Sequence, residues 1–434
     1  MSNQHTDIIE VSRLRIGHFI FIDLSWLSHP FPLNSFKIHT LEQIETIRSL
    51  GIDRVRYSPE RSDPEPEESK SDSTEPRDAP APGPRPGSVD RSNAMEEQDV
   101  ESRRRKVLAD QQASLKACER EFSSASREFR TVLGSVRTNP GAALEAASSV
   151  VGGMAGHMLR AGEICIRLLS EKVGERASHE INVTVVSLLL GEACGFDELA
   201  LHELGLGALL HDIGKIDLPD RLRYSREHRS AAERQIYQEH VAYGIALARN
   251  MGLPPEVQTI IAQHHEHVDG SGYPKRIKNA ALSPAARIVA LVNHYDNLCN
   301  PGNPALAMTP HEALSQIFTL RNERFDAPTV NTLIRMMGVY PPGSVIQLTD
   351  DRYALVTSVN AQRPLKPRVI IHDRQVPRED ALVVDLADHP EVGIRRSLRP
   401  LQLPRATYDY LSPRTRICYF FERSMGTLDE GGAP

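Results

Sequence analysis

The sequence predicts a mainly α-helical protein with a small α+β domain at one end and a small β-rich unit at the other. From Pro140 to about residue 338, apolar residues recur at helical spacing, and glycine and proline breaks divide this region into six to eight helices. Before residue 59, an alternating apolar pattern precedes a short helical one. After Tyr340, short runs rich in valine and isoleucine are typical of strands.

The small α+β domain is predicted over residues 6–58. Apolar residues alternate loosely between Val11 and Ile22, as they do in strands. Residues 41–50 then show helical spacing and end before Gly51, which suits a helix C-cap. Residues 52–57 are expected to form a closing strand.

Three further segments follow this domain. Residues 59–100 form a predicted disordered linker, because prolines punctuate a run of serine and charged residues and apolar residues almost vanish. Residues 101–138 are charged but carry one apolar stripe, which predicts a connector helix that forms a coiled coil or lies on the next domain. The helical domain is expected over residues 139–338, and the β-rich C-terminal extension over residues 341–424.

Composition excludes several classes of protein. With 434 residues the chain has room for two or three domains, and its net charge of -6 gives no basic surface for a long nucleic-acid backbone. The five cysteines are dispersed, which favours a reducing compartment over a disulfide framework. No apolar run approaches the roughly 20 residues that span a bilayer, and no signal peptide is seen. We therefore expect a cytoplasmic protein that does not associate with membranes.

Histidines and carboxylates punctuate the helical region where apolar runs begin or end. They are His179, His211, Asp212, His240, His264 and His265, and a later helix adds Asn293 and Asp296. Each adjoins an apolar helix face, so each is expected to point inward. A lone interior histidine is most simply a hydrogen-bonded core residue. An ordered set with an aspartate favours a metal site instead, because burying unpaired charge is costly.

These residues resemble the HD-GYP family of metal-dependent phosphodiesterases over about residues 150–335. The histidines and Asp212 match the metal ligands of that family in order and spacing. Lys215 matches the lysine that closes its HDxGK motif, and Gly272-Tyr273-Pro274 match the GYP signature. Residues 8–57 resemble a small uncharacterised domain that is often fused ahead of this catalytic domain.

The resemblance implies an HD-type all-helical catalytic domain that hydrolyses a cyclic dinucleotide, chiefly cyclic di-GMP, in bacterial second-messenger signalling. It implies two or three divalent metal ions, iron or manganese, with a hydroxide shared by them as the nucleophile. The implied metal ligands are Glu175, His179, His211, Asp212, His240, His264, His265 and Asn293. The implied catalytic residues are Asp212 and Lys215, and the implied substrate-binding residues are Lys215, Gly272, Tyr273 and Pro274. Glu175 matches a position used by members that hold a third metal.

The chain departs from the family at one metal ligand and at two substrate contacts. Asn293 stands where the family has a metal-binding aspartate, and its amide oxygen carries no charge. His294 and Asp296 are expected to face other directions on the same helix, so neither replaces the aspartate. Gly302 and Ala305 stand where the family has basic residues that contact the dinucleotide.

Three functional hypotheses follow. The first is an active cyclic-dinucleotide phosphodiesterase, favoured by the retained histidines and Lys215. The second is a catalytically weak or inactive HD-GYP protein that acts as a dinucleotide-binding or protein-interaction module, favoured by the neutral Asn293. The third is another HD-type phosphohydrolase. A homodimer and a signalling-protein partner are both compatible with the connector helix, and no motif indicates either.

Overall fold

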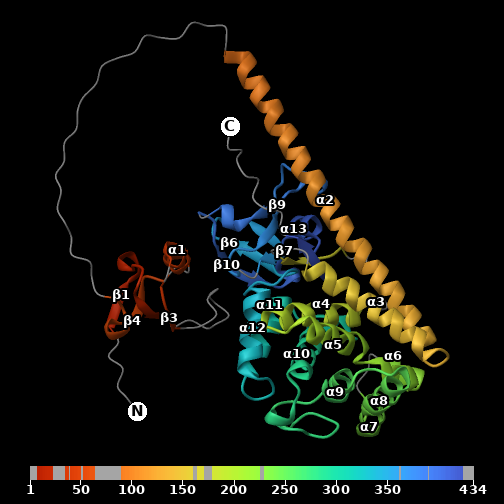
Figure 1. Cartoon of the computed structure of the whole chain (residues 1–434). Coiled ribbons are helices and arrows are strands. Elements are labelled where there is room, and N and C mark those ends of the chain that lie inside the picture. Colours follow the sequence, from red (N-terminus) through yellow and green to blue (C-terminus); the bar gives the residue numbers. More distant parts are fainter. Residues whose placement is uncertain are drawn as a thin grey trace, which may run out of the picture.

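The structure, a computed structural model, describes residues 7–22, 35–38, 40–49, 52–63, 89–159, 164–170, 178–224, 229–360, 363–389 and 391–423. Within these ranges the chain is mainly helical, with a four-stranded sheet near the N-terminus and a seven-stranded sheet built largely from the C-terminal part (Figure 1). The predicted fold class is confirmed. Among the described helices, none has the length and apolar character needed to cross a membrane.

The N-terminal unit contains β1 (Asp7–Glu10), β2 (Phe19–Phe21), β3 (Ser35–Lys37), α1 (Leu41–Ser49) and β4 (Arg54–Ser58). Its strands are ordered β1-β4-β2-β3, and neighbouring strands are antiparallel. Ile20 on β2 packs with Ile44 and Ile47 on α1 in a hydrophobic core of its own. The helix and closing strand expected from the sequence are α1 and β4.

The helix α2 (Val89–Ser135) is long and lies against the following domain, with α3 (Pro140–Leu159) beside it (Figure 1). Its apolar stripe is buried, and Phe122 and Phe129 are among its most deeply buried side chains. Gln111 exchanges two hydrogen bonds of 2.9 Å with the backbone of Val383 in the C-terminal unit. Of the two alternatives for the connector helix, the structure shows packing on the next domain.

The predicted linker extends too far toward the C-terminus. Residues 89–100, which the composition assigned to the linker, belong to α2, and residues 59–61 form a short 3₁₀ helix. Residues 64–88 lie outside the described ranges. Neither glycine nor proline occurs between Gly87 and Gly134. The charged residues in this stretch are good helix formers once glycine and proline are absent.

The helical domain continues from α3. It contains α4 (Ser178–Ala193), α5 (Glu198–Leu210), the 3₁₀ helix η4 (Ile213–Asp217), α6 (Asp220–Tyr224), α7 (Ala231–Gln238), α8 (His240–Met251), α9 (Pro255–Gln263), α10 (Pro284–Cys299), α11 (Pro310–Thr319) and α12 (Ala327–Met337). Asp197 caps α5, and Ser230 with Glu233 forms a capping box at α7. These caps fix where the helices start and hence where their side chains point.

The C-terminal unit shares its sheet with the helical domain. Its elements are β6 (Val345–Leu348), β7 (Tyr353–Asn360), β8 (Arg368–Ile371), β9 (Val383–Asp385), β10 (Ile394–Leu398), α13 (Arg405–Leu411) and β11 (Tyr419–Arg423). The strand β5 (Ile164–Leu168) lies between β11 and β7 and is antiparallel to both. One strand thus stands inside residues 139–338, which the pattern assigned to helices. It is rich in isoleucine, but its partners lie far away in sequence.

Candidate metal centre

The aspartate and five histidines singled out in the sequence converge where helices begin or end. His211 is the C-cap of α5, and Asp212 follows it. His240 is the first residue of α8, and His264 is the C-cap of α9. The three histidines are at most 1% exposed, because the apolar faces of their helices draw these ends into the core.

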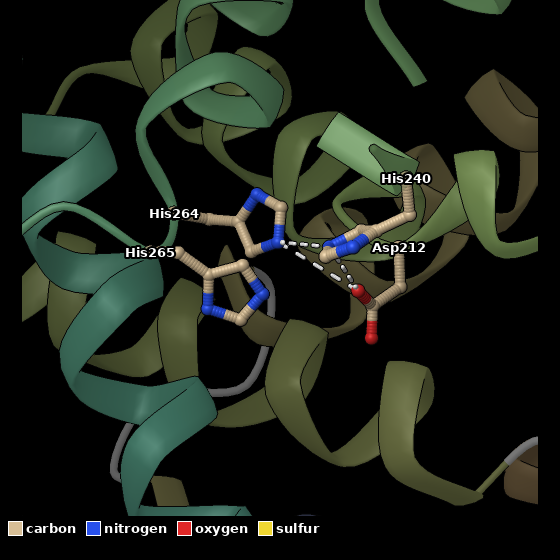
Figure 2. A group of neighbouring side chains, drawn as sticks. All are labelled: Asp212, His240, His264 and His265. Atoms are coloured by element: carbon tan, nitrogen blue, oxygen red, sulfur yellow. Dashed lines mark hydrogen bonds and ion pairs between the residues drawn. The ribbon is translucent and has the colours of Figure 1, made fainter. Parts of the chain in front are cut away.

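Asp212 is shared between two groups of candidate ligands. The first group is Asp212, His240, His264 and His265, which Figure 2 draws, and the second is His179, His211 and Asp212; within each group the ligand atoms lie within 4.8 Å of one another. Oδ1 of Asp212 lies 3.4 Å from Nε2 of His240 and 3.6 Å from Nε2 of His264. Oδ2 lies 3.2 Å from Nε2 of His211 and 3.7 Å from Nε2 of His179. Each carboxylate oxygen faces a different group, as in a carboxylate that bridges two cations.

Hydrogen bonds to backbone carbonyls place a proton on Nδ1 of three of these imidazoles and so fix their tautomer. Nδ1 of His211 donates to the Ala208 carbonyl at 2.7 Å, and Nδ1 of His264 donates to the Ile261 carbonyl at 2.8 Å. Nδ1 of His240 donates to the carbonyl three residues earlier, at 2.6 Å. A neutral imidazole that donates from Nδ1 has its lone pair on Nε2, the atom that faces Asp212 in each case.

The facing atoms are therefore acceptors without protons between them. Nε2 of His240 lies 3.4 Å from Nε2 of His264. Oδ1 of Asp212 and the Nε2 atoms of His211 and His265 are buried and have no hydrogen-bond partner in the structure. Orphaned buried acceptors cost roughly 1–3 kcal/mol each, so an arrangement of several is stable only around something that accepts their lone pairs. Imidazole nitrogens and carboxylate oxygens suit a first-row divalent ion, and the donor set fits such a group.

The electrostatics keep the ligands in the required protonation states. Burial lowers the pKa of His240 to about 4, and it also lowers the pKa of His264 and His265. Burial alone would raise the pKa of Asp212, but the adjacent Lys215 ammonium holds it well below its ordinary value. The neutral imidazole is thus favoured at neutral pH for His240, His264 and His265, and the ionised carboxylate is favoured for Asp212; these are the forms that bind metals.

The metal-free protein is expected to lose stability as the pH falls from about 6.5 toward 4. In the folded chain His240 has a pKa of about 4, against 6.5 for an unperturbed histidine, so between these values the unfolded chain binds the extra proton. That shift corresponds to about 3 kcal/mol in full. His264 and His265 act in the same direction, whereas His179, whose pKa is raised, opposes them. Urea unfolding after chelation measures the effect, and stability that rises on acidification would contradict it.

Two motif glycines allow the backbone to pack closely around the centre. A Cβ on Gly214 would overlap the carbonyl oxygen of His240 and the backbone nitrogen of Gly244, where η4 crosses α8. A Cβ on Gly272 would overlap the carbonyl oxygen of His265 and lie 2.6 Å from the backbone nitrogen of His267. Both glycines are needed because only hydrogen fits at these positions.

The predicted substrate-binding residues differ in how they contact the centre. The ring of Tyr273 stacks on that of His265, with centroids 4.5 Å apart, and its backbone nitrogen donates to the His265 carbonyl at 3.1 Å. The Lys215 ammonium forms an ion pair with Asp212. Gly272 is a buried residue within the loop, so its role is to shape the loop. Pro274 is exposed.

The two remaining predicted metal ligands are Glu175 and Asn293. Glu175 lies outside the described residues. Asn293 is buried on α10, and its Oδ1 accepts a hydrogen bond of 2.7 Å from Nδ2 of Asn297 on the same helix. Its amide oxygen is therefore already engaged by a neighbour.

The sequence placed Asp296 among the inward-pointing candidates but expected it to face a different direction from Asn293. The expectation that it faces away from the centre is wrong, because its Oδ2 lies 2.7 Å from Nδ1 of His179. A carboxylate at this position orients the imidazole and leaves Nε2 facing Asp212. The signal was available, since residues three apart on a helix lie on the same side, which places Asp296 with Asn293. His294 does lie elsewhere, with its ring 5.3 Å from that of Phe325.

Two family models match the chain. Residues 163–329 match the HD domain, and residues 8–147 match a domain of unknown function (DUF3391). The second match includes the N-terminal unit, α2 and the start of α3. It thus extends well beyond residues 8–57, where the sequence resemblance was placed.

Three curated relatives match part of the chain. A cyclic di-GMP phosphodiesterase of Pseudomonas aeruginosa is 25% identical over 226 residues, which are 51% of this chain and 54% of that protein. The cyclic di-GMP phosphodiesterase response regulator RpfG of Xanthomonas campestris is 32% identical over 165 residues, 37% of this chain and 42% of that protein. A 3′3′-cGAMP-specific phosphodiesterase of Vibrio cholerae is 26% identical over 162 residues, 37% of this chain and 31% of that protein. The chain spans about half the length, or less, of these relatives.

Proposed function

Because residues 163–329 form an HD domain of the HD-GYP family, we propose that the chain is a metal-dependent phosphodiesterase that hydrolyses a cyclic dinucleotide. Cyclic di-GMP is the first candidate substrate, and 3′3′-cGAMP is the second, since relatives act on each. The observation that carries the proposal is the sharing of Asp212 between two groups of histidine nitrogens. Two-metal hydrolases use such a carboxylate to hold two ions beside one phosphodiester.

We assign one ion to His179, His211 and Asp212, and a second to Asp212, His240, His264 and His265. Iron or manganese suits these ligands, and Glu175 is the candidate ligand for a third ion. When bound, such ions supply Lewis-acid activation of water and neutralise charge on the phosphoryl oxygens.

The protein side chains would position and neutralise the scissile phosphate. The Lys215 ammonium, held beside the centre by Asp212, adds a positive charge where phosphoryl oxygens gain negative charge. Tyr273, which is partly exposed and stacks on the His265 ring, would contact the bound ligand. Asp296 keeps His179 in the orientation that faces Asp212.

Turnover and metal content, measured on the same preparations, test the proposed function. The full chain is loaded with manganese or iron, its metal content is determined, and cyclic di-GMP and 3′3′-cGAMP are followed to linear dinucleotide or mononucleotide. Metal-dependent cleavage of either supports the proposal. Metal-loaded protein that binds a dinucleotide without cleaving it supports the binding-module hypothesis, which Asn293, Gly302 and Ala305 favour. Cleavage of other phosphoesters alone supports a different phosphohydrolase.

Replacing Asn293 by aspartate is expected to increase metal retention. The change restores a negative charge beside the centre, and such changes in the surroundings of a metal typically alter affinity by roughly 10- to 100-fold. Dialysis against chelator, with metal analysis over time, measures the effect. Asn293→Ser, which also removes the amide oxygen that accepts from Asn297 but adds no charge, serves as the control. An equal gain in both variants, or faster metal loss from Asn293→Asp, would contradict the placement of this helix.

A further inference from the structure

A tyrosine that belongs to neither ligand group connects the metal centre to two cations. The ring of Tyr237 lies 5.0 Å from the ring of His240, and its carbonyl accepts the Nδ1 proton of that histidine. Cζ of Arg229 lies 3.9 Å from the centroid of the Tyr237 ring, and Nζ of Lys215 lies 5.5 Å from it. The two cations therefore share one aromatic ring at the edge of the centre.

The Arg229 guanidinium is only partly paired. One of its terminal nitrogens, Nη2, donates to the Leu222 carbonyl at 3.1 Å. Its Nε is buried and has no hydrogen-bond partner in the structure. Lys215, in contrast, is paired with Asp212. An unpaired charged donor beside an anion-binding centre indicates a position where a ligand acceptor belongs.

We propose that Arg229, held on the Tyr237 ring, binds the second phosphate of a cyclic dinucleotide, the one that is not cleaved. This inference rests on the proposed function. The metal ligands and Lys215 account for the scissile phosphate, but a cyclic dinucleotide carries a further anion that needs its own partner. Gly302 and Ala305 have no cationic side chain to provide one. Arg229, which precedes α7, supplies that charge from a different element.

The experiment compares substrates with one and two phosphates. Arg229→Ala is expected to raise KM for cyclic di-GMP roughly 10- to 100-fold, since it removes a charge-assisted hydrogen bond, while kcat and metal content stay unchanged. Hydrolysis of bis(p-nitrophenyl) phosphate, which has one phosphate, stays unchanged as well. Arg229→Lys recovers part of the affinity. Arg221→Ala, which removes an exposed arginine that pairs with Glu233, leaves both substrates unaffected.

Three results would overturn the inference. These are an unchanged KM for the dinucleotide, equal losses on both substrates, and loss of metal. If the wild-type chain cleaves no cyclic dinucleotide, the proposed function fails, and equilibrium binding of cyclic di-GMP then decides about Arg229. Weaker binding by Arg229→Ala than by the wild type still supports the site, whereas equal or absent binding overturns it.

A second observation concerns the C-terminal segment around β11, which is linked through two asparagines to Asp296, the residue that orients His179. Oδ1 of Asp296 accepts hydrogen bonds from Nδ2 of Asn182 at 3.0 Å and from Nδ2 of Asn300 at 2.9 Å. The same two amide groups donate to the Ile417 carbonyl, at 2.7 and 2.9 Å. Their oxygens accept from the backbone nitrogens of Tyr419 and Ile417, at 2.9 and 2.8 Å.

Both amides are thus saturated, and each joins Asp296 to one backbone segment. Ile417 and Tyr419 lie beyond residues 163–329, which match the HD domain. The Tyr419 hydroxyl also lies 2.9 Å from that of Tyr295, one residue before Asp296. Asn182, Asp296 and Tyr419 are buried, and Asn300 is partly buried, so a partner lost by Asp296 is not readily replaced by water.

We infer that Asn182 and Asn300 are positioning residues, which hold Asp296 and thereby His179 through the C-terminal strand. The metal centre then depends on the β-rich C-terminal unit and not on the helical domain alone. Replacing either amide by an apolar residue leaves Asp296 with fewer donors and lets the His179 ring rotate.

Asn182→Leu and Asn300→Leu test this inference. Each is expected to lose the ion assigned to His179 at least several-fold faster during chelation, with the other ion retained. Glu422→Gln is the control, because it weakens the same strand by breaking the buried pair with Arg167, at 3.2 Å, without contacting Asp296. In the metal-free protein, NMR of the His179 imidazole shows the Nδ1 proton in the wild type and the control but not in the two variants. If the variants retain that signal and both ions, the inference is overturned. If the wild type binds no metal, the NMR signal alone decides whether Asn182 and Asn300 position His179.

Discussion

Asp212→Asn is expected to abolish metal binding in both ligand groups and to lower turnover by about 10³-fold or more. Among the described residues, Asp212 alone belongs to both groups, and each of its oxygens faces a different group. The amide keeps the volume but loses the charge that two cations would share. Lewis-acid stabilisation is worth several kcal/mol, and each 1.36 kcal/mol corresponds to a factor of ten in rate.

Metal analysis and dinucleotide turnover, measured on the same preparations, check this result. Asp217→Asn is the matched control. Asp217 is the last residue of η4, the 3₁₀ helix that follows Asp212, but it pairs with Arg137 at the surface. The control is expected to keep its metal and its activity. An Asp212→Asn protein that still holds two ions per chain would show that the carboxylate does not bridge them.

The sequence was sufficient to group the residues that meet in the structure. His211, His240 and His264 each follow or begin an apolar run, and burial of that run forces the adjacent polar side chain inward. Local pattern therefore determined which side chains turn to the core. Their number and their association with Asp212 favoured a metal site over ordinary core packing.

The pattern could not reveal contacts that depend on distant pairing. The strand β5 looks like part of a helical region until β11 pairs with it, with Tyr419 opposite Leu168. The same strand pairing places Ile417 beside Asn182 and Asn300, two contacts that the sequence pattern could not indicate. Helical spacing assigns a face, but only the tertiary fold determines which backbone lies opposite that face.

The prediction of a disordered linker over residues 59–100 shows a different limit. Residues 89–100 have few apolar residues, so composition alone indicated disorder. They are nevertheless helical because they continue a helix whose later part, around Phe122 and Phe129, is anchored in the core. Extending an existing helix costs less free energy than nucleating a new one, so α2 begins before residue 101, where the sequence pattern placed its start.

Gly214→Ala is expected to produce the largest loss of stability among single substitutions near the centre, about 2–4 kcal/mol. The added Cβ would overlap the carbonyl oxygen of His240 and the backbone nitrogen of Gly244, and it would lie 2.9 Å from the Gly244 Cα. All three atoms belong to the backbone of α8, so no side-chain rotation relieves the overlap. The helix must move away from η4, and His240 moves with it.

Urea unfolding and metal analysis together distinguish this outcome from a general effect of alanine. Gly153→Ala is the matched control, because Gly153 lies in α3 with no atom within 4 Å of its added Cβ. There the substitution is expected to stabilise the protein by roughly 0.5–1 kcal/mol, since alanine favours helix more than glycine does. Because α8 carries His240 but not His179 or His211, Gly214→Ala should weaken the ion assigned to His240 first. Equal stability of the two variants, or loss of the other ion first, would mean that the packing of η4 on α8 does not set the position of His240.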